Sequence, residues 1–72
     1  MNSQEFLDWI KLQVDMLEQR VKHDDDPERD HGTEDYIYLE ALKHISSGGG
    51  FAQEVATQAL RTQRFIETRW YA

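Results

Sequence analysis

Hydrophobic residues in the first part of the chain recur with the period of an α-helix. At about 100° per residue, one stripe carries an apolar side chain on every turn: Phe6, Ile10, Val14, Leu17 and Val21, with Leu7 at its edge. Asn2 or Ser3 supplies an N-cap, and Glu5 follows Asn2 at the spacing of a capping box. The pattern predicts a helix from about residue 3 to residue 22.

A second apolar stripe on the same segment consists of Trp9, Leu12 and Met16. Gln13 and Arg20 separate it from the first stripe. A helix in a small bundle buries one face against its own chain, so a second apolar face needs another surface. We therefore expect this stripe to contact another chain.

Residues 23–33 (HDDDPERDHGT) interrupt the helical pattern with Pro27, Gly32 and a dense run of charge. We predict a solvated acidic loop over this range, followed by Thr33 as a helix N-cap. The next helix should cover residues 34–45. Its expected core face consists of Tyr38, Ala41, Leu42 and Ile45, flanked by Ile37 and Leu39.

A third helix is predicted over residues 50–70, again with one mainly apolar face. That face consists of Ala52, Val55, Ala56, Ala59, Leu60, Gln63, Ile66 and Trp70, and its alanines would let a neighbouring helix approach closely. Phe51 and Phe65 point the other way, where we expect no partner within the chain. Because no segment shows the two-residue alternation of a strand, the predicted fold is all-α, a single three-helix domain over residues 1–72.

The size of the chain favours self-association. A domain of 72 residues has a small core, and the chain contains no cysteine that would staple it. We therefore expect a homo-oligomer, most simply a dimer. Mean hydropathy is −0.79 and no long apolar run is present, so we expect neither a signal peptide nor a membrane span and assign the protein to the cytoplasm.

Charge is distributed unevenly along the chain, whose formal net charge is −6. Residues 1–45 hold twelve acidic and five basic side chains, whereas residues 46–72 hold two and three. Such a surface repels nucleic acid and anionic membranes and favours a partner with a basic surface. The residues expected to meet that partner are Asp24, Asp25, Asp26, Glu28 and Asp30.

The run Gly48-Gly49-Gly50 precedes the third predicted helix. Phosphate-binding loops need a lysine and a serine or threonine after the last glycine, but Phe51 and Ala52 stand there. We interpret the glycines as a joint that ends one helix in a left-handed turn and starts the next. The alternative is an anion site, formed by the backbone N–H groups of the glycines with the side chain of Arg61, Arg64 or Arg69 from the same or a neighbouring chain.

The sequence contains no recognisable catalytic or metal-binding constellation. The acidic loop lacks the spacing of an EF-hand, and carboxylate pairs do not converge from two predicted helices. Ser46 and Ser47 lie near His44 without a placed acid, so no hydrolase triad is indicated. A helix-turn-helix reader would need a turn at Leu60, where the sequence shows no break. We expect no enzyme activity, no metal and no cofactor.

These observations favour a non-enzymatic interaction protein that binds and modulates or inhibits another protein. Such a role suits small acidic regulators, including those carried by phages and other mobile elements. The interface is expected to contain Trp9, Leu12, Met16, Phe51 and Phe65. The alternative is an oligomeric binder of a phosphorylated nucleotide at Gly48–Phe51, and a third hypothesis is a DNA-binding regulator that uses the last helix.

Overall fold

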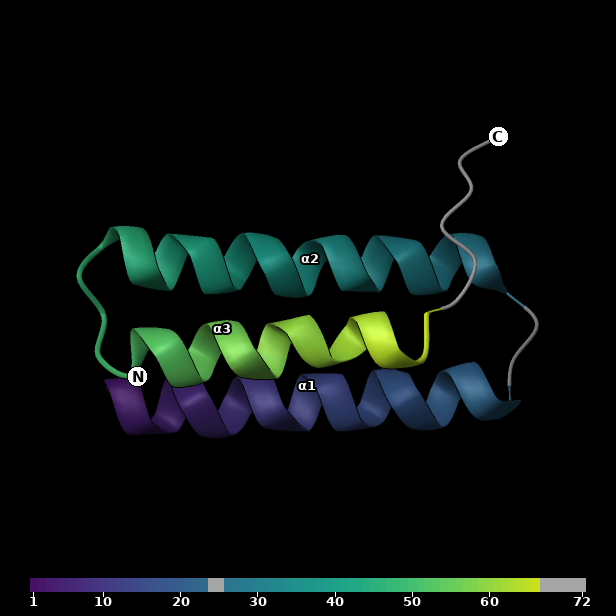
Figure 1. Ribbon diagram of the computed structural model, residues 1–72, viewed down its shortest axis with the longest axis horizontal. Coiled ribbons are helices and arrows are strands. Elements are labelled where there is room, and N and C mark those ends of the chain that lie inside the picture. The colour runs from purple at the N-terminus through teal and green to yellow at the C-terminus, as the bar shows by residue number, and fades with distance from the viewer. Residues whose placement is uncertain (24–25, 67–72) are drawn as a thin grey trace.

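The protein is a bundle of three α-helices in the computed structural model, which describes residues 1–23 and 26–66. The helices are α1 (Ser3–His23), α2 (Pro27–Ser46) and α3 (Ala52–Leu60), and a short 3-10 helix, η1 (Arg61–Arg64), follows α3. α2 runs back along α1, and α3 lies beside both (Figure 1). No strand occurs within the described residues. The predicted all-α, three-helix architecture is confirmed.

α1 has the start and the buried face that the sequence indicates. The Asn2 N–H donates to Glu5 Oε1 over 2.9 Å, and the Glu5 N–H donates to Asn2 Oδ1 over 2.8 Å, which completes the capping box. Phe6 and Val21 pack at the margin of the core. The fully buried positions of this helix are Leu7, Ile10, Val14 and Leu17.

α2 begins at Pro27 and not at residue 34, so the predicted acidic loop is wrong for residues 27–33. The Asp26 carboxylate caps this helix by accepting the Arg29 N–H over 3.0 Å. Proline suits the first turn of a helix, because its missing N–H would have no acceptor there. The predicted cap, Thr33, lies inside the helix instead, and its hydroxyl donates to the Arg29 carbonyl over 3.2 Å.

The inward face of α2 also differs from the prediction. Ile37 and Ala41 are buried, but Leu42 is 64% exposed and Leu39 is 52% exposed. Asp30 and Glu34 are buried on the inward side together with His31. The helix is therefore rotated away from the face that apolar residues alone would select, because its acidic residues find hydrogen-bond partners inside the bundle.

α3 is shorter than predicted, since it ends at Leu60 and gives way to η1. Val55, Ala59 and Ile66 are buried as expected. Leu60 is 54% exposed, and Thr62 takes a place in the core with no exposed surface. The remaining residue of the predicted face, Trp70, lies outside the described residues.

Candidate functional site

Aromatic side chains connect α1 to α2 at the surface. The rings of Phe6 and Trp9 are 5.6 Å apart, and Tyr36 meets Trp9 edge-on at a centroid distance of 6.1 Å. Trp9 is consequently only partly exposed and packs against the core. These partners within the chain could not be predicted, because the periodicity of α1 carries no information on the position of Tyr36; contact of the stripe with another chain stays a prediction.

Leu12 and Met16 do project from α1 as expected, with 53% and 56% of their surfaces exposed. Tyr36 on α2 is 49% exposed. Together with Trp9, these side chains form one surface that spans α1 and α2, which we call the Trp9 surface. Its apolar and aromatic composition is that of the centre of a protein interface.

The other two predicted interface residues do not belong to the Trp9 surface. Phe65 is partly buried and packs against the core. Phe51 is 43% exposed and stands before α3 with φ of 59°. Its neighbour Gly50 donates its N–H to Ser3 Oγ over 2.8 Å, so this end of the chain lies beside the start of α1. The five predicted residues are therefore divided among three places.

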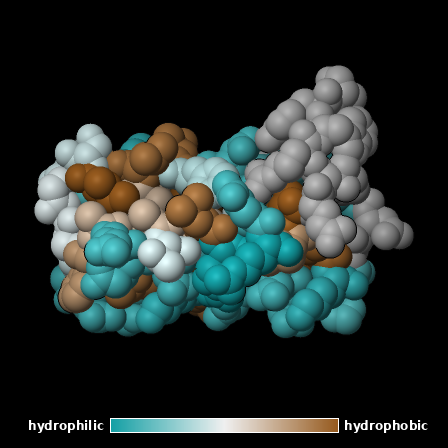
Figure 2. Space-filling model, viewed as in Figure 1, coloured by the Kyte–Doolittle hydropathy of each residue, from teal (hydrophilic) through white to brown (hydrophobic). Residues whose placement is uncertain are grey.

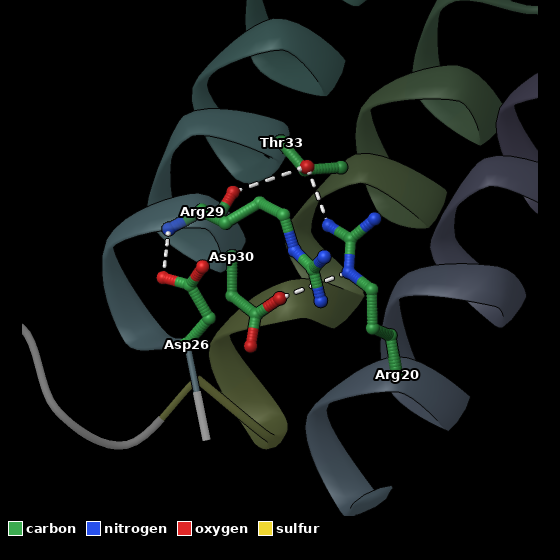
Figure 3. Close-up of polar contacts among 5 residues, drawn as sticks. All are labelled: Arg20, Asp26, Arg29, Asp30 and Thr33. Atoms are coloured by element: carbon green, nitrogen blue, oxygen red, sulfur yellow. Dashed lines mark hydrogen bonds and ion pairs between the residues drawn. The ribbon is translucent and has the colours of Figure 1, made fainter. Parts of the chain in front are cut away.

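The predicted acidic set does not form one exposed surface either. Asp26 caps α2, and Asp30 is 5% exposed and accepts a hydrogen bond from Arg20 Nε over 3.0 Å. Figure 3 shows this cluster, in which Arg20 extends from α1 toward the first turns of α2. Glu28 is exposed, whereas Asp24 and Asp25 lie outside the described residues.

Acidic side chains on α1 instead lie beside the Trp9 surface. Glu5 precedes Trp9 by one helical turn, and Asp8 and Asp15 stand one turn on either side of Leu12. All three are exposed. Asp15 accepts a hydrogen bond from Arg61 Nη2 over 2.7 Å, whereas Glu5 and Asp8 accept hydrogen bonds from the uncharged residues Asn2 and Gln4. The border of the Trp9 surface on α1 is thus predominantly acidic.

The glycine run forms a joint between α2 and α3. Gly48 adopts the left-handed conformation with φ of 81° after Ser47 caps α2, as the sequence predicts. The N–H groups of Gly48 and Gly49 donate to the carbonyls of Ile45 and His44 over 3.0 and 2.9 Å. Because the Gly50 N–H is taken by Ser3, all three N–H groups have acceptors within the chain.

The arginines of the alternative anion site lie at the other end of α3 from the glycines. Arg61 binds Asp15 and lies 3.6 Å from Glu18 Oε1, and Arg64 is exposed in η1. About ten residues of helix separate Gly50 from these side chains, or roughly 15 Å at 1.5 Å per residue. Within the described part of a single chain, the glycines and these arginines therefore do not converge on one phosphate.

A buried polar cluster occupies the middle of the bundle, and sequence reasoning missed it. Glu34 has no exposed surface, and its Oε2 lies 2.6 Å from Thr62 Oγ1 and 2.9 Å from the Tyr38 hydroxyl. His31 Nδ1 lies 3.6 Å from Oε1 of the same carboxylate. The available signal was the placement of Glu34 one turn before Ile37 on the inward face. This cluster connects α2 to η1 and gives the buried carboxyl group of Glu34 hydrogen-bond partners.

Within residues 1–23 and 26–66, no three histidine, aspartate or glutamate side chains are grouped so as to hold a metal ion. No helix in these ranges is long and apolar enough to cross a membrane. Comparisons with protein-family models, curated proteins and solved structures give no significant match. The Trp9 surface, with its acidic border, is the best candidate functional site that the geometry provides.

Proposed function

We propose that this protein is a non-enzymatic interaction protein that binds and modulates another protein through the Trp9 surface. The observation that carries the proposal is the half-exposed state of Leu12, Met16 and Tyr36 around a partly buried tryptophan. Tryptophan, tyrosine and methionine are enriched at the centres of protein interfaces, where they contribute a large share of the binding energy. The rest of α1 is highly charged and marks the limits of this surface.

The acidic border supports a basic partner. Glu5 and Asp8 attract lysine and arginine side chains at the edge of the interface, where such charges chiefly raise the association rate and select the partner. A matching segment has an apolar strip for Leu12 and Met16 and basic residues beside it. An amphipathic helix with these properties is a common ligand for a shallow apolar surface. The protein modulates such a partner by covering its basic segment.

The experiment uses a synthetic amphipathic peptide with leucines on one face and lysines on the other as the probe. We expect micromolar binding, about −8 kcal/mol, measured by titration calorimetry and accompanied by a shift of the Trp9 indole resonance. A peptide of the same pattern with glutamate in place of lysine should not bind. Raising the salt concentration should weaken the binding of the lysine peptide, because screening reduces its attraction to the acidic side chains at the border.

A matched pair of variants locates the binding site. The double substitution Leu12→Ser with Met16→Ser should weaken binding about tenfold or more, since each buried apolar side chain contributes about 1.5–3 kcal/mol. The control is Leu42→Ser at an exposed leucine on α2, which should leave the affinity unchanged. Equal binding by the double variant and the native chain, or no binding by the native chain, contradicts the proposal.

A further inference from the structure

A second apolar face lies along α2 and α3, distinct from the Trp9 surface. On α2 it contains Leu39 and Leu42, and on α3 it contains Ala52, Ala56 and Leu60. The three leucines are each more than half exposed, Ala52 is exposed and Ala56 is partly buried. We call this set the leucine–alanine face.

Two contacts show how α2 and the α3–η1 segment are oriented toward each other. Arg61 reaches Asp15 on α1, so this flank of the α3–η1 segment faces α1 and the flank with Leu60 faces α2. Tyr38 reaches Thr62, which sets the flank of α2 with Leu42 toward α3. In Figure 2, hydrophobic residues gather over neighbouring parts of α2 and α3, and hydrophilic residues cover the lower edge along α1.

The leucine–alanine face has no net charge, although the whole chain carries −6. Its border on α3 and η1 contains the uncharged side chains Gln53, Thr57 and Gln63. The charged residues at its margins balance in pairs, Asp35 with Arg64 and Glu40 with Lys43, of which the second pair is in contact at 3.4 Å. By contrast, the exposed acids beside the Trp9 surface on α1 are Glu5, Asp8 and Asp15.

We infer that the leucine–alanine face binds a second copy of this chain. Two copies with the same negative charge repel each other, and they approach at least cost through the face that carries no net charge. A strongly basic partner, by contrast, is drawn to the acids of α1. The charge distribution thus assigns this face to self-association and the Trp9 surface to a foreign protein.

The composition of the face also suits a two-fold dimer. In such a dimer the same patch meets itself, so that the leucines of one copy oppose the alanines of its partner. Small residues at Ala52 and Ala56 let the helices pack closely, and leucines supply the apolar area. Burial of this area supplements the small core of a 72-residue domain.

The test is the solution mass of the full chain by sedimentation velocity, over concentrations from about 5 to about 200 µM. We expect a reversible equilibrium between the 8.5 kDa monomer and a dimer. Leu42→Glu combined with Leu60→Glu should raise the dissociation constant at least about tenfold, because the two-fold axis brings the new charges together. Both leucines are exposed, and circular dichroism checks that the variant keeps its helices.

The matched control is Leu12→Glu combined with Met16→Glu, which adds the same charge to the Trp9 surface and should leave the dimer intact. Raising the salt concentration should strengthen the dimer, because screening lowers the repulsion between the two acidic copies. A monomer at every concentration, or a dimer that only the Leu12 and Met16 variant disrupts, overturns the inference. A dimer that dissociates more readily at high salt also overturns the inference, since such a dimer would depend on ion pairs.

This inference and the proposed function can fail separately. The peptide titration measures binding at the Trp9 surface, whereas sedimentation measures dimerisation through the leucine–alanine face. A Gln53→Cys variant carrying a spin label adds a third measurement, because the chain has no other cysteine. Dipolar coupling between labels on two copies is expected for Gln53→Cys and not for a label at Lys11→Cys on α1; the reverse pattern would place the dimer contact on α1.

Discussion

The end of the bundle where α1 meets α2 is held by charged side chains, whereas the end where α2 meets α3 is held by backbone groups. At the first end, Arg20 binds Asp30 over 3.0 Å and Thr33 Oγ1 over 2.5 Å (Figure 3). At the second, Ser3 and His44 bind the N–H and the carbonyl of Gly50 over 2.8 and 2.9 Å. The first end therefore depends on matched charges, and the second on the absence of side chains from its glycines.

The two ends also differ in the space that they leave for a side chain in place of glycine. Gly32 lies inside α2, and a Cβ added there would meet no atom within 4 Å. A Cβ on Gly49 would stand 2.3 Å from two atoms of the His44 ring. That ring has little freedom to move, because it stacks on Phe6 at a centroid distance of 4.1 Å and binds Gly50.

The largest effect is expected at the end of the bundle where Arg20 binds Asp30. Arg20→Leu leaves Asp30 buried without its arginine and should lower the free energy of unfolding by about 3 kcal/mol, the lower end of the range for breaking a buried pair, because Arg20 is partly exposed. Urea denaturation measures the loss. Lys22→Leu is the control; its contact with Glu18 is 3.9 Å long and exposed, so we expect a change below about 0.5 kcal/mol.

A double variant decides whether the charge of Asp30 is responsible. Asp30→Asn added to Arg20→Leu removes the uncompensated charge, so it should recover part of the lost stability. A double variant as unstable as the sum of the two single variants would show that Arg20 and Asp30 are not coupled.

The second largest effect is expected at the other end, where Ser3 and His44 bind the backbone of Gly50. Gly49→Ala should destabilise the protein by about 2 kcal/mol, since the His44 ring must give up its stacking on Phe6 or its bond to Gly50. Thermal melts measure the change. Gly32→Ala is the same substitution in open space within a helix, and it should raise stability by about 0.5–1 kcal/mol.

His44→Ala provides the further check on Gly49. In that background Gly49→Ala meets no ring, so its cost should fall to a few tenths of a kcal/mol. If Gly49→Ala costs the same with and without His44, the two residues do not compete for space and the packing argument is wrong.

The smallest effect concerns the helix start at the charged end. Asp26→Ala removes the acceptor for the Arg29 N–H and should cost about 1 kcal/mol, the usual value of an N-cap. Asp26→Asn keeps an acceptor and should cost a few tenths of a kcal/mol. The hydrogen-exchange rates of the amides of residues 28–30 measure how often the first turn of α2 opens. Unchanged rates in Asp26→Ala would contradict the assignment of Asp26 as the cap.

Local signals in the sequence predicted much of the helical framework. Asn2 and Glu5 act on each other across one turn, and the stripe of Leu7, Ile10, Val14 and Leu17 on α1 depends only on helical period. The joint at Gly48 was also predictable, because a left-handed residue after a helix favours glycine. For the candidate site, the exposure of Leu12 and Met16 follows from the same periodicity.

The sequence by itself determined that the chain forms three helices and where α1 begins, because capping, helical period and glycine conformation act between residues close in sequence. Tertiary structure decided which face of α2 is buried. Asp30 and Glu34 enter the bundle because Arg20 on α1 and Thr62 in η1 supply their hydrogen bonds, and no local pattern reveals such distant partners. The contacts of Trp9 and Phe65 likewise depend on how the helices pack. Packing therefore determined which apolar side chains stay exposed and can contact another chain.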